Sequence, residues 1–193
     1  MKKRFFYILF FLPFFAWAQA GTMEVFIPAR PGPAIVPGSE ELARAFRELR
    51  LGMDLEELKK ALAGDGLFEF RGDRDVSFLP AKEENLVETT GLSFIRRAFF
   101  QLREGRVFIM AFSLDPSMID HYSVFTSLIE KYGEPVLLNP REAIWENGET
   151  RISIERPLTV KYIDMTVFKA IMGEAKAEEA AEVFRRRGFL DEF

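Results

Sequence analysis

Two long runs of strand-forming residues, 93–103 and 106–114, are separated only by Glu104-Gly105. A two-residue connection can join only antiparallel neighbours, because parallel strands need a crossover of a dozen or more residues. The pair therefore predicts an antiparallel sheet at the centre of the fold. Shorter strands are predicted on both sides of it, at 67–71, 75–79, 85–89, 142–146, 149–156 and 158–164.

A helix is predicted ahead of each group of strands. The first, LEELKKALA, begins after Asp54 as its N-cap and ends at Gly64, and its leucines recur at the spacing of one helical face. A shorter helix is predicted over 40–48 with Ser39 as its cap, although 46–51 could equally form a strand.

Two further helices are predicted in the second half of the chain. One covers about 118–132, because its apolar residues share a face and Gly133 followed by Pro135 is a typical helix end. The other runs from about Glu174 to Arg187, with acidic residues first and arginines last, which matches the helix dipole.

The order of these elements predicts an α+β fold in a domain over 40–173. A helix followed by antiparallel strands occurs twice, over about 40–116 and 117–173, which indicates one antiparallel sheet built from two related halves. We expect the helices to cover one face of this sheet while the other face meets water. A C-terminal helix and tail, 174–193, complete the chain.

The first twenty residues have the order of a cleavable export signal. Positive charges at positions 2 to 4 precede an apolar run over 5–15, and small residues at 18 and 20 fit a signal-peptidase site. The run is shorter than the roughly 20 residues that span a bilayer. We expect cleavage after Ala20 and a periplasmic or secreted protein; an uncleaved signal, the alternative, would anchor the chain in a membrane. The proline-rich segment 21–39 is predicted to be an extended spacer.

The charge balance restricts the partners of the mature chain. Three of the 26 basic residues and none of the 30 acidic residues lie in the signal, so cleavage leaves 23 basic and 30 acidic side chains, a formal net charge of −7. This acidity disfavours nucleic acid and anionic membranes, which attract basic surfaces. The chain contains no cysteine, so an exported domain of this sequence depends on its apolar core rather than on disulfides.

Three stretches resemble parts of known exported proteins. LGMDLEEL at 51–58 resembles the opening of small periplasmic proteins with the beta-lactamase-inhibitor-protein-like fold and of small outer-membrane-assembly lipoproteins. KYGEP at 131–135 and WENGETRI at 145–152 are similar to helix-exit and hairpin segments of exported bacterial proteins with helix–strand repeats. The resemblance implies an α+β fold that binds other proteins on its sheet. It carries over no catalytic residue, and the chain lacks the lipidated cysteine of the lipoproteins.

No residue pattern in the sequence points to catalysis, to a metal or to a cofactor. His121 is the only histidine, whereas a zinc site normally recruits several His or Cys ligands. The sequence has no G-x-S-x-G elbow that would place a serine nucleophile beside this histidine. Paired carboxylates such as Glu56 and Glu57 are predicted on solvated faces. The tripeptide Arg71-Gly72-Asp73 matches a cell-adhesion motif, but a turn between two strands explains it.

The hairpin 93–114 supplies the candidate binding surface. A two-residue loop pairs Phe99 with Met110 and Phe100 with Ile109, which places a wholly apolar face beneath the helices. Interfaces are enriched in aromatic residues, Met and Arg. The other face has this composition, and its candidate partner-binding residues are Arg97, Phe99, Gln101, Phe108, Met110 and Phe112. The alternatives are that strand 158–164 or the C-terminal helix covers this face, and an odd-length loop would exchange the faces.

The turn Asn147-Gly148 sets the register of the next hairpin. A two-residue loop there pairs Trp145 with Thr150, and the face expected to be buried consists of Ala143, Trp145, Ile152 and Ile154. The following strand must then bury Leu158, Val160 and Tyr162. Because side chains alternate along a strand, this requires an odd-length loop or a bulge at Arg156-Pro157.

Three functions fit the sequence, in decreasing order of preference. The first is a non-catalytic exported module that binds an unidentified protein through its sheet. The second is a carrier of a small apolar ligand, and the third is a carboxylate-dependent enzyme. A filled core with an open mixed face favours the module, and a closed apolar cavity favours the carrier. A concave pocket with a strongly shifted carboxylate pKa favours the enzyme.

The export signal makes the first testable prediction. If signal peptidase cleaves after Ala20, mass spectrometry of the exported protein will find Gly21 at its N-terminus. A chain that retains Met1 would contradict the prediction and would identify a membrane-anchored protein.

Overall fold

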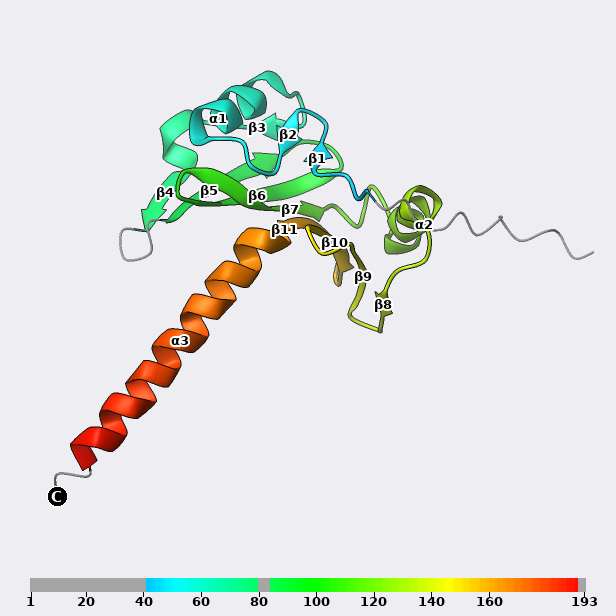
Figure 1. Cartoon of the computed structure of the whole chain (residues 1–193). Helices are drawn as coiled ribbons and strands as arrows, with labels where there is room; N and C mark the ends of the chain where they lie inside the picture. The colour runs from blue at the N-terminus through cyan, green and yellow to red at the C-terminus, as the bar shows by residue number, and fades with distance from the viewer. Residues whose placement is uncertain (1–40, 80–83, 191–193) are drawn as a thin grey trace, which may run out of the picture. The chain divides into compact units, whose positions relative to one another are not determined.

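The computed structural model describes residues 41–79 and 84–190 (Figure 1). The predicted signal at 1–20 and the predicted spacer at 21–39 lie outside the described residues. The elements follow in the order β1 (Ala45–Phe46), β2 (Leu49–Arg50), α1 (Leu55–Gly64), β3 (Phe68–Glu69), the 3₁₀ helix η1 (Gly72–Asp75), β4 (Val76–Leu79), β5 (Glu84–Gly91), β6 (Ile95–Arg103), β7 (Arg106–Leu114), α2 (His121–Tyr132), β8 (Leu137–Leu138), β9 (Glu142–Glu146), β10 (Thr150–Glu155), β11 (Thr159–Asp164) and α3 (Met165–Leu190).

Nine of the described strands form one antiparallel sheet, in the order β3-β5-β6-β7-β11-β10-β9-β8 with β4 beside β5. The first half of the chain contributes β3 to β7 and the second half contributes β8 to β11. The two halves meet where β7 pairs with β11. The α+β fold with one antiparallel sheet is therefore confirmed.

Both short helices pack on the same face of the sheet. The side chain of Asp54 accepts a hydrogen bond from the Glu57 backbone N–H (2.9 Å), and the Glu57 side chain accepts one from the Asp54 N–H (3.0 Å), so α1 begins with a capping box. The side chain of Asp120 caps α2 by accepting a hydrogen bond from the Ser123 backbone N–H (2.9 Å), and the helix starts three residues later than predicted. Buried residues of α1 and α2 belong to one apolar core, and they are Leu58, Leu62, Leu128 and Tyr132.

The helix predicted over 40–48 is wrong within the described residues. Residues 45–50 form the hairpin β1–β2 instead, and Arg47 occupies a left-handed conformation in its turn (φ 56°). Leu49 and Leu51 are buried while Arg50 between them is exposed, which is the alternation of a strand. Phe46 lies against Phe112 of the core, with ring centroids 4.5 Å apart.

The C-terminal helix α3 begins at Met165, nine residues before the predicted start. The side chain of Asp164 accepts hydrogen bonds from the backbone N–H groups of Thr166 (3.0 Å) and Val167 (3.2 Å), which is the geometry of an N-cap. The sequence predicts no element for residues 165–173, where β-branched residues lower the helix propensity.

The hairpin β9–β10 differs from the predicted register but keeps the predicted faces. Trp145 pairs with Ile152 rather than with Thr150. The turn is longer than predicted because the Asn147 side chain accepts a hydrogen bond from the Thr150 backbone N–H (3.0 Å), which stabilises the longer turn. A shift of two residues leaves every side chain on its own face. The predicted inner face is accordingly buried, with Ala143, Trp145, Ile152 and Ile154 all at most 2% exposed.

The predicted odd-length loop at Arg156-Pro157 is confirmed. Glu155 pairs with Thr159, so three residues connect β10 to β11. This loop brings the next strand into the register that buries its apolar residues, Leu158, Val160 and Tyr162.

Candidate functional site

The sheet has two faces of different character. A row of paired residues crosses the face beneath α1 and α2, and no member is more than 6% exposed: Val87, Phe100, Met110, Tyr162, Ile152 and Trp145. This face is therefore closed core. A candidate binding surface must lie on the opposite face, at an edge of the sheet or on a helix.

A β-bulge in the β6–β7 hairpin decides which residues reach the opposite face. The turn at Glu104-Gly105 has the predicted two-residue length, since Arg103 pairs with Arg106 and Leu102 with Val107. Gln101 then pairs with Ile109, so Phe108 is an extra residue in β7. Beyond Phe108 the register is shifted by one residue, and the two faces of β7 are exchanged.

The bulge divides the six candidate residues into two sets. Met110 (0% exposed) and Phe112 (1%) belong to the core, and Phe108 (4%) is buried outside the core cluster. The prediction that the six share one face is therefore wrong. Only Arg97, Phe99 and Gln101 lie together on the outer face. Their partners on β7 are Ser113, Ala111 and Ile109, and the predicted register had placed Ile109 and Ala111 beneath the helices.

We call this surface the open face, and no residue of it belongs to the core cluster beneath α1 and α2. Its half-exposed apolar side chains come from four strands. Its half-exposed or exposed members are Leu86, Glu88, Arg97, Phe99, Gln101, Ile109, Ile144, Glu146, Arg151, Glu155 and Lys161. The candidate residues predicted from the sequence include none on β9, β10 or β11. The sequence does predict an outward face for the β9–β10 hairpin, consisting of Glu142, Glu146, Arg151, Ser153 and Glu155. Four of these residues are half-exposed, but Ser153 is buried (2% exposed), so the prediction is wrong for Ser153.

Ion pairs between neighbouring strands surround the apolar side chains of the open face. Lys161 Nζ lies 2.6 Å from a Glu155 oxygen, and Arg97 pairs with Glu88 at 2.9 Å. Arg151 also lies 2.6 Å from a Glu146 oxygen. Because all these groups retain solvent contact, each pair contributes only about 0–1 kcal/mol. The pairs can therefore exchange partners at small cost.

The beginning of α3 is attached at the margin of the open face. Arg103, at the end of β6, lies 2.6 Å from a Glu174 oxygen and 3.7 Å from a Glu84 oxygen. Lys169 donates a hydrogen bond to the Gly148 carbonyl (3.2 Å). The C-terminal helix therefore covers the margin of the open face, as one predicted alternative stated, but it does not cover the centre. Arg97 and Gln101 are exposed there, and Phe99 is half-buried.

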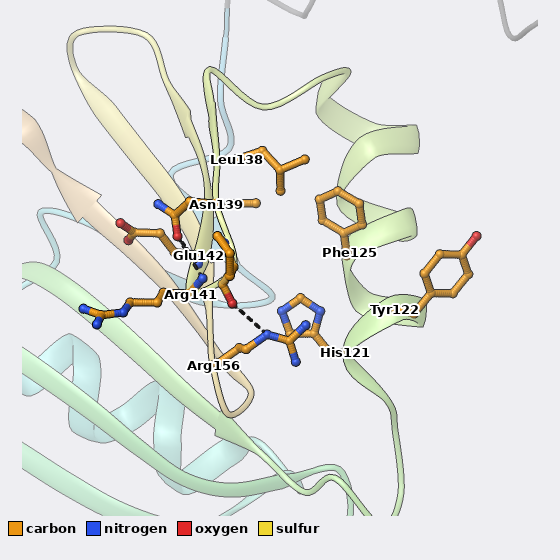
Figure 2. Close-up of a pocket in the computed structure, with 10 residues that line it drawn as sticks. His121, Tyr122, Phe125, Leu138, Asn139, Arg141, Glu142 and Arg156 are labelled. Carbon is orange, nitrogen blue, oxygen red and sulfur yellow. Dashed lines mark hydrogen bonds between the residues drawn. The ribbon is translucent and has the colours of Figure 1, made fainter.

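A pocket of about 220 Å³ lies between α2 and the β8–β9 turn (Figure 2). Phe125 and Leu138 point toward each other across it, and the Arg156 guanidinium lies beside the His121 ring (Figure 2). Arg156 Nε donates a hydrogen bond to the Pro140 carbonyl (2.9 Å), which fixes the guanidinium at the wall. The pocket can accept a small group with an apolar side and an anionic end.

His121 is the imidazole of this pocket. Partial burial, followed by the nearby Arg156 guanidinium, lowers the pKa of the His121 imidazole below its ordinary value, and the Asp120 carboxylate opposes this only in part. No serine, threonine or cysteine lines the pocket, and Glu142 points away from the His121 ring (Figure 2). Across residues 41–79 and 84–190, no three His, Cys, Asp or Glu side chains are grouped to hold a metal ion.

Comparison with family models matches residues 44–174 to the family described as the TP0088 domain. The chain belongs to the TP0088 domain family. The TP0088 domain of this chain contains the whole sheet, α1, α2 and the open face, and it ends at Glu174, the residue that pairs with Arg103. No curated protein and no solved structure matches the chain. In the part of the chain that the structure describes, no helix has the length and apolarity needed to cross a membrane.

The lowered pKa of His121 can be measured directly, because the only histidine of the chain gives a single titrating imidazole signal. We expect an NMR titration midpoint below the ordinary value of about 6.5. Arg156→Gln should raise the midpoint, since it removes one cause of the shift. A wild-type midpoint at or above 6.5 would contradict the account of this pocket.

The sign of the accompanying stability change follows from linkage. The unfolded chain binds a proton on His121 more readily than the folded chain does, because the pKa of His121 is lower in the folded state. The contribution of His121 to the free energy of unfolding is therefore fully present above about pH 6.5, and it is lost as the pH falls through the folded-state pKa. His121→Gln should therefore show a smaller decrease in the free energy of unfolding between pH 7 and pH 5 than the wild type.

Proposed function

We propose that this protein is an exported, non-catalytic module that binds another protein through the open face of its sheet. The observation that carries the proposal is the contrast between the two faces. One face is filled core beneath α1 and α2, and the other presents half-exposed Phe99, Ile109 and Ile144 among exchangeable ion pairs. Apolar and aromatic side chains with arginine at their border are typical of protein interfaces.

The export part of the proposal rests on the signal-like segment 1–20. Its architecture part is consistent with the resemblance to beta-lactamase-inhibitor-protein-like proteins, which implies partner binding on an antiparallel sheet. In the observed sheet α1 and α2 cover one face, and only the beginning of α3 lies at the margin of the other, which leaves most of the open face accessible to a partner.

The charges of the open face indicate the chemistry of the partner. Basic and acidic side chains alternate across the strands, with Arg97 beside Glu88, Lys161 beside Glu155 and, on the far strands, Arg151 beside Glu146. A partner with a strong net charge of either sign would meet repulsion from half of these groups. We therefore expect a partner surface of mixed charge with an apolar centre.

The two other candidate functions have less support from the described residues. The pocket at α2 has about 220 Å³, below the roughly 300–1,000 Å³ typical of small-molecule sites. A pocket of about 430 Å³ lies between the β1–β2 turn and α1, but most of the residues that line it are charged, so neither pocket is the closed apolar cavity that would favour a carrier. The carboxyl groups of Asp115 and Asp120 have a lowered pKa because they accept hydrogen bonds from Ser117 and Ser123, which is a structural role at turns and caps.

Site-specific photo-cross-linking in the producing cells tests the proposal. A photoreactive phenylalanine analogue in place of exposed Gln101 should give a discrete covalent adduct with another polypeptide. The same analogue in place of Tyr122, which is 74% exposed on α2, should not. Phe99→Ala should lower the adduct yield at position 101 about tenfold, because aromatic side chains near an interface centre carry much of its binding energy.

Stability measurements on matched variants separate an interface from a core. Phe99→Ala should lower the free energy of unfolding by only about 1 kcal/mol, whereas its neighbour Phe100→Ala, with a fully buried side chain, should lower it by about 3–5 kcal/mol. Adducts at Tyr122 but not at Gln101, or an adduct yield that Phe99→Ala leaves unchanged, would contradict binding through the open face.

A further inference from the structure

Most of α3 is exposed rather than buried against the described residues. The helix has 26 residues, and Met165 is its only buried residue. Every residue from 172 to 190 is exposed, including Val183 (60%) and Phe184 (79%), and the helix extends away from the sheet (Figure 1). A helix in water without packing is only marginally stable, and its two glycines, Gly173 and Gly188, each cost about 1 kcal/mol relative to alanine.

One face of the exposed helix is suited to close packing against another helix. At 100° per residue, Phe184 shares this face with Ala177, Ala181 and Gly188, three, four or seven residues away. A Cβ atom placed on Gly188 meets nothing within 4 Å, so the space beside it is open. The large Phe184 ring therefore lies among small residues. A second helix with the same face can accommodate this ring beside its own small residues.

Apart from Lys176, the charges along the exposed part of α3 are separated by sign about Phe184. Acidic residues precede it, at Glu174, Glu178, Glu179 and Glu182, and three consecutive arginines follow it, at positions 185, 186 and 187. Two such helices aligned in parallel would place like charges together. Two antiparallel copies would place the acidic half of each against the basic half of the other, as helix dipoles also favour.

We propose that the exposed part of α3 forms an antiparallel helix pair with α3 of a second copy of this chain. In the register that matches large to small side chains, Phe184 packs against the partner's Ala181, and Ala177 packs against the partner's Gly188. Glu178 and Arg185 lie on the same flank of this face, so each faces the opposite charge on the second copy. The pair joins two TP0088 domains and leaves both open faces available.

A charge-exchange experiment tests the pairing, because contacts within one chain cannot produce its expected results. Glu178→Arg and Arg185→Glu each create two like-charge contacts per pair, and each should weaken dimerisation of the full chain about tenfold in sedimentation equilibrium. An equimolar mixture of the two variants should recover wild-type affinity, because the mixed pair contains only opposite-charge contacts. The double variant should recover it as well.

Glu179→Arg is the matched control, because position 179 lies on the far side of the helix and should leave dimerisation unchanged. A chain that remains monomeric at all concentrations would overturn the proposal. If neither single substitution changes the dimerisation affinity, or if the equimolar mixture stays monomeric, this interface is excluded. The partner surface would then be another part of this chain or a helix of a different protein.

Discussion

The extra residue in β7 is the constraint on which the rest of this structure depends. With Phe108 set aside by the bulge, Phe112 turns toward the helices instead of toward solvent. Its ring then contacts aromatic residues from both halves of the chain, with centroid distances of 4.5–6.3 Å to Phe46, Phe68, Phe100 and Tyr162. Burial of Met110 and Phe112 is worth about 1.5–3 kcal/mol each, which far exceeds the cost of one irregular ladder position.

The same bulge leaves the open face less apolar than an unbulged hairpin would make it. Ala111 and Ser113 replace Met110 and Phe112 there, and Phe99 is the one aromatic residue of β6 that remains on this side. The resulting surface is polar enough to meet water yet has an apolar centre. The proposed binding of a partner rests on this balance, because protein interfaces combine an apolar centre with a polar rim.

The sequence predicted the elements better than the faces. Asp54 is a strong local cap and α1 was predicted at its true start, whereas Asp120 was not used as a cap and α2 was predicted to start three residues too early. The β9–β10 hairpin kept its predicted faces despite a wrong register, because the error was two residues and side chains alternate with a period of two. The β6–β7 hairpin was off by one residue, and the same period exchanged its faces. Nothing next to Phe108 marks a bulge locally. The bulge could have been predicted only from the requirement that the largest apolar side chains of β7 be buried beneath the helices.

The absence of cysteine from the natural sequence permits a direct measurement of the bulge by thiol labelling. Ser113→Cys and Met110→Cys lie on opposite faces of β7, and without the bulge their positions would be exchanged. The account predicts that the thiol of Ser113→Cys reacts readily with a maleimide in the folded protein, while that of Met110→Cys reacts only after unfolding in denaturant. A reactive Met110→Cys together with a protected Ser113→Cys would contradict the account.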